Sequence, residues 1–62
     1  MQLISEHTES TRTSLVYQLS GDQYEVLTRD SSDNYSRARF FSSVDLAEDF
    51  AEDFVKTARV LL

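Results

Sequence analysis

The segment from Phe41 to Leu62 constrains the fold more than any other part of the chain, because it has the pattern of one amphipathic helix. Side chains of an α-helix advance by about 100° per residue, so residues three and four apart share a face. One half of that wheel is apolar and is formed by Leu46, Ala47, Phe50, Ala51, Phe54, Val55, Ala58, Leu61 and Leu62. The other half is polar and is formed by Asp45, Glu48, Asp49, Glu52, Asp53, Lys56 and Arg59. We therefore predict a C-terminal helix that buries one face.

The start of this helix is also marked in the sequence. Ser42 is suited to be the N-cap, and this would place Asp45 at the third helical position, as in a capping box. In the same register Phe41 and Leu46 form the apolar pair that often staples a helix start. The acidic residues come early and the basic residues late, and both placements suit the helix dipole.

Upstream, the apolar period changes to the period of two that is typical of strands. One alternating segment presents Leu15, Tyr17 and Leu19 on one face, and the next presents Tyr24, Val26 and Thr28. A Gly21-Asp22 loop between them would make a tight hairpin, because glycine accepts positive φ. It places Leu19 opposite Tyr24 and brings the two sets onto one face. A Ser20-Gly21 loop would keep the same faces, so the turn type stays open.

A polar loop leads to a third predicted strand, Tyr35 to Phe41. Its apolar residues Ala38 and Phe40 would pair with Val26 and Tyr24 on the face that the helix covers. The arginines of this strand would then lie on the opposite face of the sheet.

Residues 1–12 allow two interpretations. They form either an edge strand that pairs with residues 13–19, with residues 8–12 as the hairpin loop, or a frayed tail. The strand is the favoured interpretation. We predict one domain over residues 1–62. The predicted fold class is α+β, with an antiparallel sheet of three or four strands and one C-terminal amphipathic helix packed on one face.

A chain of 62 residues can form only a small core. Because cysteine is absent, no disulfide can staple it, and stability must come from packing or from self-association. The predicted core consists of Leu15, Tyr17, Leu19, Tyr24, Val26, Ala38, Phe40, Leu46, Phe50, Phe54, Ala58 and Leu61.

The sequence offers little for catalysis, cofactors or metals. His7 is the only histidine, and with no cysteine a zinc site is not expected. A single glycine cannot build a phosphate-cradling loop, and no serine lies in a Gly-x-Ser-x-Gly context. The N-terminus lacks the pattern of a signal peptide, and no apolar run approaches the roughly 20 residues of a membrane span. We therefore expect a cytoplasmic, non-catalytic protein without cofactor or membrane association.

The first candidate binding surface is the acidic half of the helix, formed by Asp45, Glu48, Asp49, Glu52 and Asp53. Such a row is most often a solvated face, but it would also dock a basic partner or mimic a nucleic-acid backbone. The helix dipole accounts for acids in the first turn only. Adjacent like charges repel, so local stability does not explain Glu52 and Asp53, although Glu52 can pair with Lys56.

The second candidate is the sheet face that we expect to point away from the helix, with Arg29, Tyr35, Arg37 and Arg39. A one-sided antiparallel sheet needs polar residues there in any case, but arginines beside an aromatic ring can also contact phosphates and bases. The layout of residues 13–61 resembles that of AP2-type and some integrase amino-terminal DNA-binding domains, without a shared motif. The resemblance implies a DNA-binding sheet, whereas the net charge of −5 argues against nucleic-acid affinity.

These observations predict a non-catalytic interaction or accessory module whose acidic helix face binds another protein with a basic surface. Its small size and acidity are also typical of accessory proteins of phages and mobile elements, including inhibitors of host nucleic-acid enzymes. The alternative is a nucleic-acid-binding domain that uses the sheet arginines. A structural homodimer is a weaker alternative.

Overall fold

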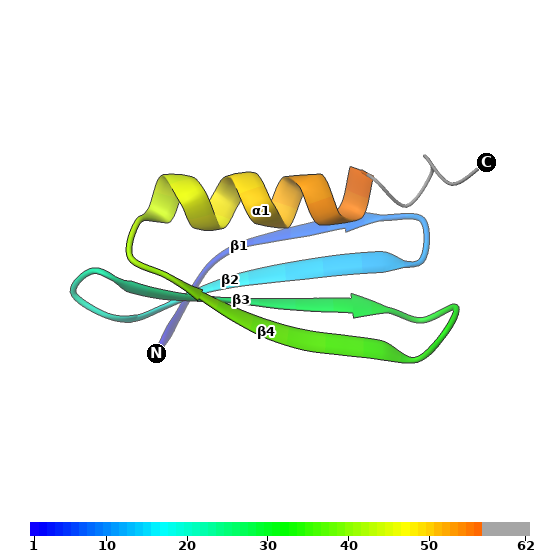
Figure 1. The fold of residues 1–62 in the computed structure, drawn as a ribbon, viewed down its shortest axis with the longest axis horizontal. Coiled ribbons are helices and arrows are strands. Elements are labelled where there is room, and N and C mark those ends of the chain that lie inside the picture. The colour runs from blue at the N-terminus through cyan, green and yellow to red at the C-terminus, as the bar shows by residue number, and fades with distance from the viewer. Residues whose placement is uncertain (57–62) are drawn as a thin grey trace.

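A four-stranded antiparallel sheet with one helix on one face forms the fold (Figure 1). The structure is a computed structural model that describes residues 1–56. The strands are β1 (Gln2–Glu9), β2 (Arg12–Ser20), β3 (Gln23–Asp30) and β4 (Tyr35–Phe41), and they lie side by side in chain order. Helix α1 (Val44–Lys56) follows β4. The predicted α+β class is confirmed, and the N-terminal segment is a strand rather than a tail.

Short loops join the strands. β1 and β2 pair from Glu9 and Arg12 outward, so their loop is Ser10 and Thr11 alone, shorter than the predicted loop of residues 8–12. Ser10 has a φ of 59° and Asn34, the last residue before β4, has a φ of 64°. Both are short polar residues, and asparagine in particular tolerates this left-handed region.

The hairpin of β2 and β3 has the predicted loop but not the predicted faces. Ser20 pairs with Gln23 around Gly21-Asp22, and the register then shifts between Gln18 and Ser20. The extra residue is Leu19, which forms a bulge. Because a shift of one residue exchanges the two faces of a strand, Val16 pairs with Val26 on the helix side. The prediction that Leu15, Tyr17 and Leu19 share a face with Tyr24, Val26 and Thr28 is therefore wrong.

The loop itself also differs in conformation from the prediction. Gly21 does not have a positive φ. Instead the side-chain amide of Gln18 donates to the carbonyl oxygen of Gly21 at 2.8 Å. The loop is thus closed by this hydrogen bond beside the bulge rather than by a left-handed glycine.

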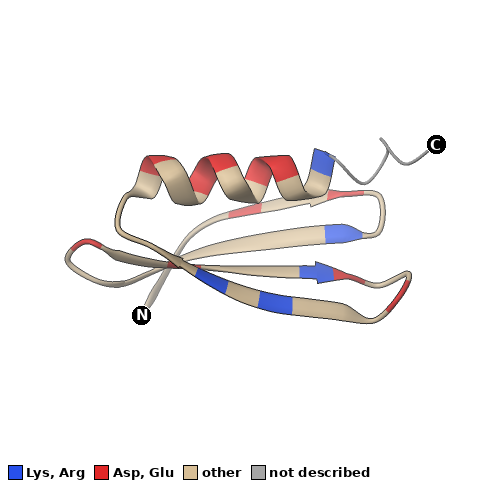
Figure 2. Cartoon of the chain, in the orientation of Figure 1, with Lys and Arg blue, Asp and Glu red and all other residues tan. Residues whose placement is uncertain are grey.

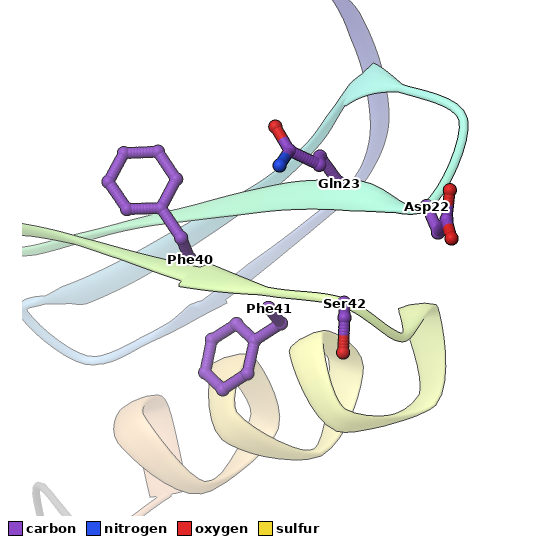
Figure 3. Close-up of a pocket in the computed structure, with 5 residues that line it drawn as sticks. All are labelled: Asp22, Gln23, Phe40, Phe41 and Ser42. Carbon is purple, nitrogen blue, oxygen red and sulfur yellow. The ribbon is translucent and has the colours of Figure 1, made fainter.

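The two faces of strand β4 are likewise exchanged relative to the prediction. Val26 pairs with Arg39 and Leu27 with Ala38, so the arginines of β4 are on the helix side and Ala38 is on the far side. Figure 3 shows Phe41 directed toward the helix and Phe40 directed away from it. Since β3 pairs regularly with β4, the face of each β4 residue follows from the face of its partner on β3.

The core between sheet and helix is built from small side chains. Val16, Val26, Ala47 and Ala51 are fully buried, and Val55 is nearly so. Alanine at two successive turns lets the helix backbone lie close to the sheet, and the Ser14 hydroxyl reaches the carbonyl oxygen of Ala51 at 3.0 Å. The helix contacts mainly the two central strands.

The predicted core was largely wrong in its members. Val26 is buried, and Tyr24 and Phe50 pack against the core. Phe40 and Leu46 are exposed instead, by 67% and 55% of their surface. The remaining predicted strand residues, apart from Val26 and Tyr24, lie on the face that α1 does not cover or in the bulge. Phe54 is half-buried at the side of the helix, and Ala58 and Leu61 lie outside the described residues.

The helix begins one residue later than predicted. The backbone amide of Leu46 lies 3.5 Å from the Ser43 hydroxyl oxygen, and the amide of Ala47 donates to the Ser43 carbonyl at 3.1 Å. Ser43, not Ser42, is therefore the N-cap. The Phe41 ring packs on Phe50, with 5.5 Å between ring centroids, and not on the predicted partner Leu46, which is exposed. The predicted capping box and staple are therefore replaced by a simple serine cap.

The new core assignment can be tested with two truncations of similar chemistry. We expect Val26→Ala to lower the free energy of unfolding by about 2–3 kcal/mol, because it opens a cavity between sheet and helix. We expect Leu46→Ala to cost less than about 1 kcal/mol, since that side chain is mostly in solvent. Urea denaturation followed by circular dichroism measures both values. Equal losses in the two variants would contradict the packing described above.

Candidate functional site

Four carboxylates cover the side of α1 that faces solvent. We call Asp45, Asp49, Glu52 and Asp53 the acidic helix surface, and all four are exposed. Figure 2 shows acidic residues along the length of the helix and a basic residue at its end. That residue, Lys56, lies 4.0 Å from Glu52 and is itself largely exposed. The structure therefore brings together four of the five acidic residues predicted to bind a partner.

The fifth predicted acid, Glu48, points toward β1 instead. Its carboxylate accepts a hydrogen bond from the Ser5 hydroxyl at 2.5 Å and lies 2.9 Å from His7 Nε2. Partial burial acts to raise the pKa of Glu48, but the hydrogen bonds from Ser5 and His7 and the charge of His7 outweigh it and hold the pKa below its ordinary value. Glu48 thus ties the helix to the edge strand.

The combination of Ser5, His7 and Glu48 contains the residue types of a hydrolase triad but not its geometry. In a triad, one imidazole nitrogen faces the nucleophile and the other faces the carboxylate. Here Nε2 lies near both groups, and the Ser5 hydroxyl is 3.5 Å from it while donating directly to Glu48. The imidazole is therefore not placed between serine and carboxylate, and this cluster is a structural contact.

The arginines of β4 form a groove with aromatic rings on the helix side. The groove has a volume of about 570 Å³ and is lined by Arg12, Tyr35, Arg37, Ala38, Arg39, Phe50 and Phe54. The guanidinium of Arg39 lies 5.1 Å from the centre of the Phe50 ring, and Arg37 lies 5.9 Å from that of Tyr35. Such contacts are cation–π interactions. We call Tyr35, Arg37 and Arg39 the arginine edge.

The predicted sheet surface is therefore split between two faces. Arg29 pairs with Thr13 and Ser36 on the face away from the helix, whereas Arg37 pairs with Thr28 on the helix side. The prediction that the three sheet arginines share one outward face is wrong, because the register of β3 with β4 pairs Val26 with Arg39 rather than with Ala38 and so exchanges the two faces of β4. Arg12 and Phe54 were not predicted as members of the groove, since only the fold brings these residues of β2 and α1 to the groove that β4 lines.

A polar cluster at one end of the sheet joins two loops to the helix. Asp30 accepts hydrogen bonds from the Thr11 hydroxyl at 2.7 Å, from Arg12 Nε at 2.9 Å, and from the Ser32 hydroxyl and backbone amide at 2.7 and 3.0 Å. Arg12 also donates to the carbonyl oxygen of Phe54 at 2.9 Å and lies over its ring. The Thr11 hydrogen bond, followed by those of Ser32 and Arg12, holds the pKa of Asp30 well below its ordinary value of 3.8.

The face of the sheet away from the helix is apolar at its centre. We call Leu3, Leu15, Tyr17, Leu27, Ala38 and Phe40 the outer sheet face, and register places all six on that side. The one helix described in residues 1–56 lies on the opposite side (Figure 1). Sequence reasoning missed this surface because it assigned most of these residues to the core.

A shallow hollow of about 410 Å³ lies where β4 leads into the helix (Figure 3). It is lined by Asp22, Gln23, Phe40, Phe41 and Ser42. One carboxylate beside two phenylalanine rings offers neither an activated nucleophile nor an acid–base pair.

Residues 1–56 contain no group of three histidine, cysteine or carboxylate side chains that could hold a metal ion. In the same part of the chain, the helix is too short and too polar to cross a membrane.

Comparisons with known protein families, curated proteins and solved structures found no match.

The Asp30 cluster predicts a specific loss of stability in acid. Because the pKa of Asp30 is lower in the folded protein than in the unfolded chain, its stabilising effect is complete above the unfolded value of 3.8 and is lost as the pH falls below it. We expect Asp30→Asn to lower the melting temperature at pH 7 and to make it less dependent on pH below about 5.

Asp33→Asn in the same loop is the matched control, because that side chain is exposed. Its melting temperature should follow the wild-type protein from neutral to acidic pH. A pH dependence for Asp30→Asn that runs parallel to that of the wild-type protein would contradict the assignment.

Proposed function

We propose that this protein is a non-catalytic interaction module that binds a partner protein with a basic surface through the acidic helix surface. The observation that carries the proposal is the exposure of Asp45, Asp49, Glu52 and Asp53 on α1, whose buried residues are Ala47, Ala51 and Val55. A surface of one sign attracts a partner of the opposite sign and speeds its association.

The spacing of these acids supports a binding role over a purely structural one. Asp45 and Asp49 are four residues apart on the helix, as are Asp49 and Asp53, and such like-charge pairs destabilise a helix by roughly 0.2–0.5 kcal/mol each. Of the four residues of the acidic helix surface, only Glu52 forms an ion pair with another described residue, Lys56, at 4.0 Å. A basic partner would relieve this repulsion on binding.

The proposal places the protein in the cytosol as a small accessory or regulatory protein. The size, the acidic composition and a fold whose described surfaces carry no catalytic geometry fit accessory proteins of phages and mobile elements, including inhibitors of host nucleic-acid enzymes. An inhibitor of that class would present carboxylates where the enzyme expects phosphates.

The test compares two triple variants with the same change in net charge. Asp49→Asn, Glu52→Gln and Asp53→Asn neutralise the acidic helix surface, whereas Glu6→Gln, Asp22→Asn and Asp33→Asn neutralise exposed acids of the sheet and its loops. Glu48 is left intact because it ties the helix to β1.

We expect the helix variant to melt at the wild-type temperature or slightly higher, because like charges are removed. In capture experiments from the native host, it should lose the partner that the sheet variant retains, as identified by mass spectrometry. Equal capture by both variants would show that the acidic helix surface is only solvated.

The arginine edge supports a second candidate, a nucleic-acid-binding function. It gathers Tyr35, Arg37 and Arg39 on one side of an edge strand, where their side chains can reach a backbone phosphate. Against it stand the eleven acidic residues, compared with six basic ones. The stacking of both arginines on aromatic rings also accounts for their position without a ligand.

We expect no binding of single-stranded or duplex DNA at physiological salt. Fluorescence anisotropy at several salt concentrations measures this, since phosphate contacts give a steep dependence on salt. Sub-micromolar binding that disappears in the Arg37→Glu, Arg39→Glu variant and persists in Arg29→Glu would reverse the order of the two candidates.

A further inference from the structure

Three large apolar side chains of the central strands point away from the helix. The core under α1 is made of valine and alanine, while Leu15, Tyr17 and Leu27 lie on the other side of the same strands. Phe40 and Leu3, also on that side, are 67% and 50% exposed. A sheet with apolar residues on both faces normally has both faces covered, and a large exposed apolar patch marks an interaction site.

We propose that a second copy of this chain covers the outer sheet face, so that two sheets pack face to face about a two-fold axis. Sheets packed in this way lie about 10 Å apart, and their inner side chains interdigitate. The axis runs across the strands and passes over Leu27. Leu27 is central because its neighbours in the register are Leu15 on one side and Ala38 on the other.

The charges on β3 select this axis. Glu25, Leu27 and Arg29 are successive outward residues of an unbulged stretch of β3, so the acid and the base lie at equal distances on either side of Leu27. A two-fold rotation about an axis across the strands at Leu27 exchanges the two ends of β3. Glu25 of each copy then faces Arg29 of the other, which makes the surface complementary to itself.

A two-fold axis parallel to the strands would not give this match. With the axis between β2 and β3, Glu25 would face Tyr17 of the other copy, since these two residues pair in the sheet. A half-buried carboxylate would then lose solvent without gaining an opposite charge, and this is strongly unfavourable. The axis across the strands avoids that loss.

The proposed axis also brings two like charges together at the edge of the sheet. Glu6 pairs with Leu15 and so lies in the row of Leu27 on edge strand β1. The rotation brings Glu6 toward its own copy, at a rim where both carboxylates are exposed to solvent. This repulsion is screened rather than buried, and Glu6→Gln should therefore tighten the dimer modestly.

The outer sheet face is large enough for a small but specific dimer interface. Four strands span about 19 Å, and three outward rows span about 20 Å with their side chains, which gives roughly 400 Å² of plane per copy. The accessible area of a corrugated surface is larger than its plane, so the pair would bury close to 1,000 Å² in total, the lower end of specific interfaces. Interfaces of this size are typical of transient complexes, so association should be followed over a wide range of concentration.

Sedimentation velocity of the full chain, from about 1 μM to about 1 mM, tests the proposal over the range of weak interfaces. The wild-type protein should shift from one chain to two with rising concentration. Glu25→Arg and Arg29→Glu should each weaken the dimer by at least about tenfold, because each places like charges opposite one another. Circular dichroism and a cooperative melt verify that each variant is folded.

Two further samples identify the axis. An equimolar mixture of Glu25→Arg and Arg29→Glu chains should recover the two-chain species, since opposite charges face each other again. The double variant Glu25→Arg, Arg29→Glu should recover it without mixing. Arg37→Glu is the matched control, because Arg37 neighbours β3 on the helix side and its reversal should leave the dimer unchanged.

A wild-type chain that stays single over the whole range would overturn the proposal. So would a dimer that the two charge variants do not weaken, or one that their mixture fails to restore. The acidic helix surface faces away from the sheet in each copy, so dimerisation neither uses nor covers it. If both proposals hold, the dimer displays two acidic helix surfaces on its opposite outer sides.

Discussion

The close approach of α1 to the two central strands is the constraint on which the rest of the structure depends. Ala47 and Ala51 lie directly over Val16 and Val26, and all four are fully buried. Side chains this small allow contact only if the helix backbone is near the sheet. The Ser14 hydroxyl then donates to the carbonyl oxygen of Ala51. The rings of Phe50 and Phe54, at the side of the helix, pack against aromatic rings of β4.

Because the helix packs on the face of Val16 and Val26, the larger side chains of Leu15, Tyr17 and Leu27 lie on the other face of the sheet. Hydrophobic stabilisation is roughly proportional to the apolar area that is buried. Burial of valine and alanine therefore stabilises the fold less than burial of leucine and phenylalanine would. The protein compensates in part with polar ties: Asp30 joins two loops to Arg12, and Glu48 joins the helix to β1. The uncovered outer sheet face is the remaining apolar area, and packing it against a second copy would enlarge the core.

The parts of the fold that follow from a single strong period were predicted well. The helical period extends over many residues of α1, so the exposure of Asp45, Asp49, Glu52 and Asp53 could be predicted from the wheel. The contacts of Glu48 with Ser5 and His7 could not, because they join residues more than forty positions apart. The arginine groove was missed for the same reason, since it joins residues of β2, β4 and α1.

By itself, the sequence determined the three later strands, the helix, their antiparallel order and the acidic side of the helix, because each depends on periodicity, turn chemistry or short connections, whereas it left residues 1–12 open. Only the tertiary structure decided which face of the sheet the helix covers. Both faces of the central strands offer apolar residues, as Leu15, Val16 and Tyr17 show, so alternation alone does not identify the buried face. The helix covers the face on which Val16 and Val26 fit beneath Ala47 and Ala51, and the bulge at Leu19 brings these two valines opposite each other. The register of β3 with β4 then places Arg37 and Arg39 on the helix side and leaves Arg29 on the other.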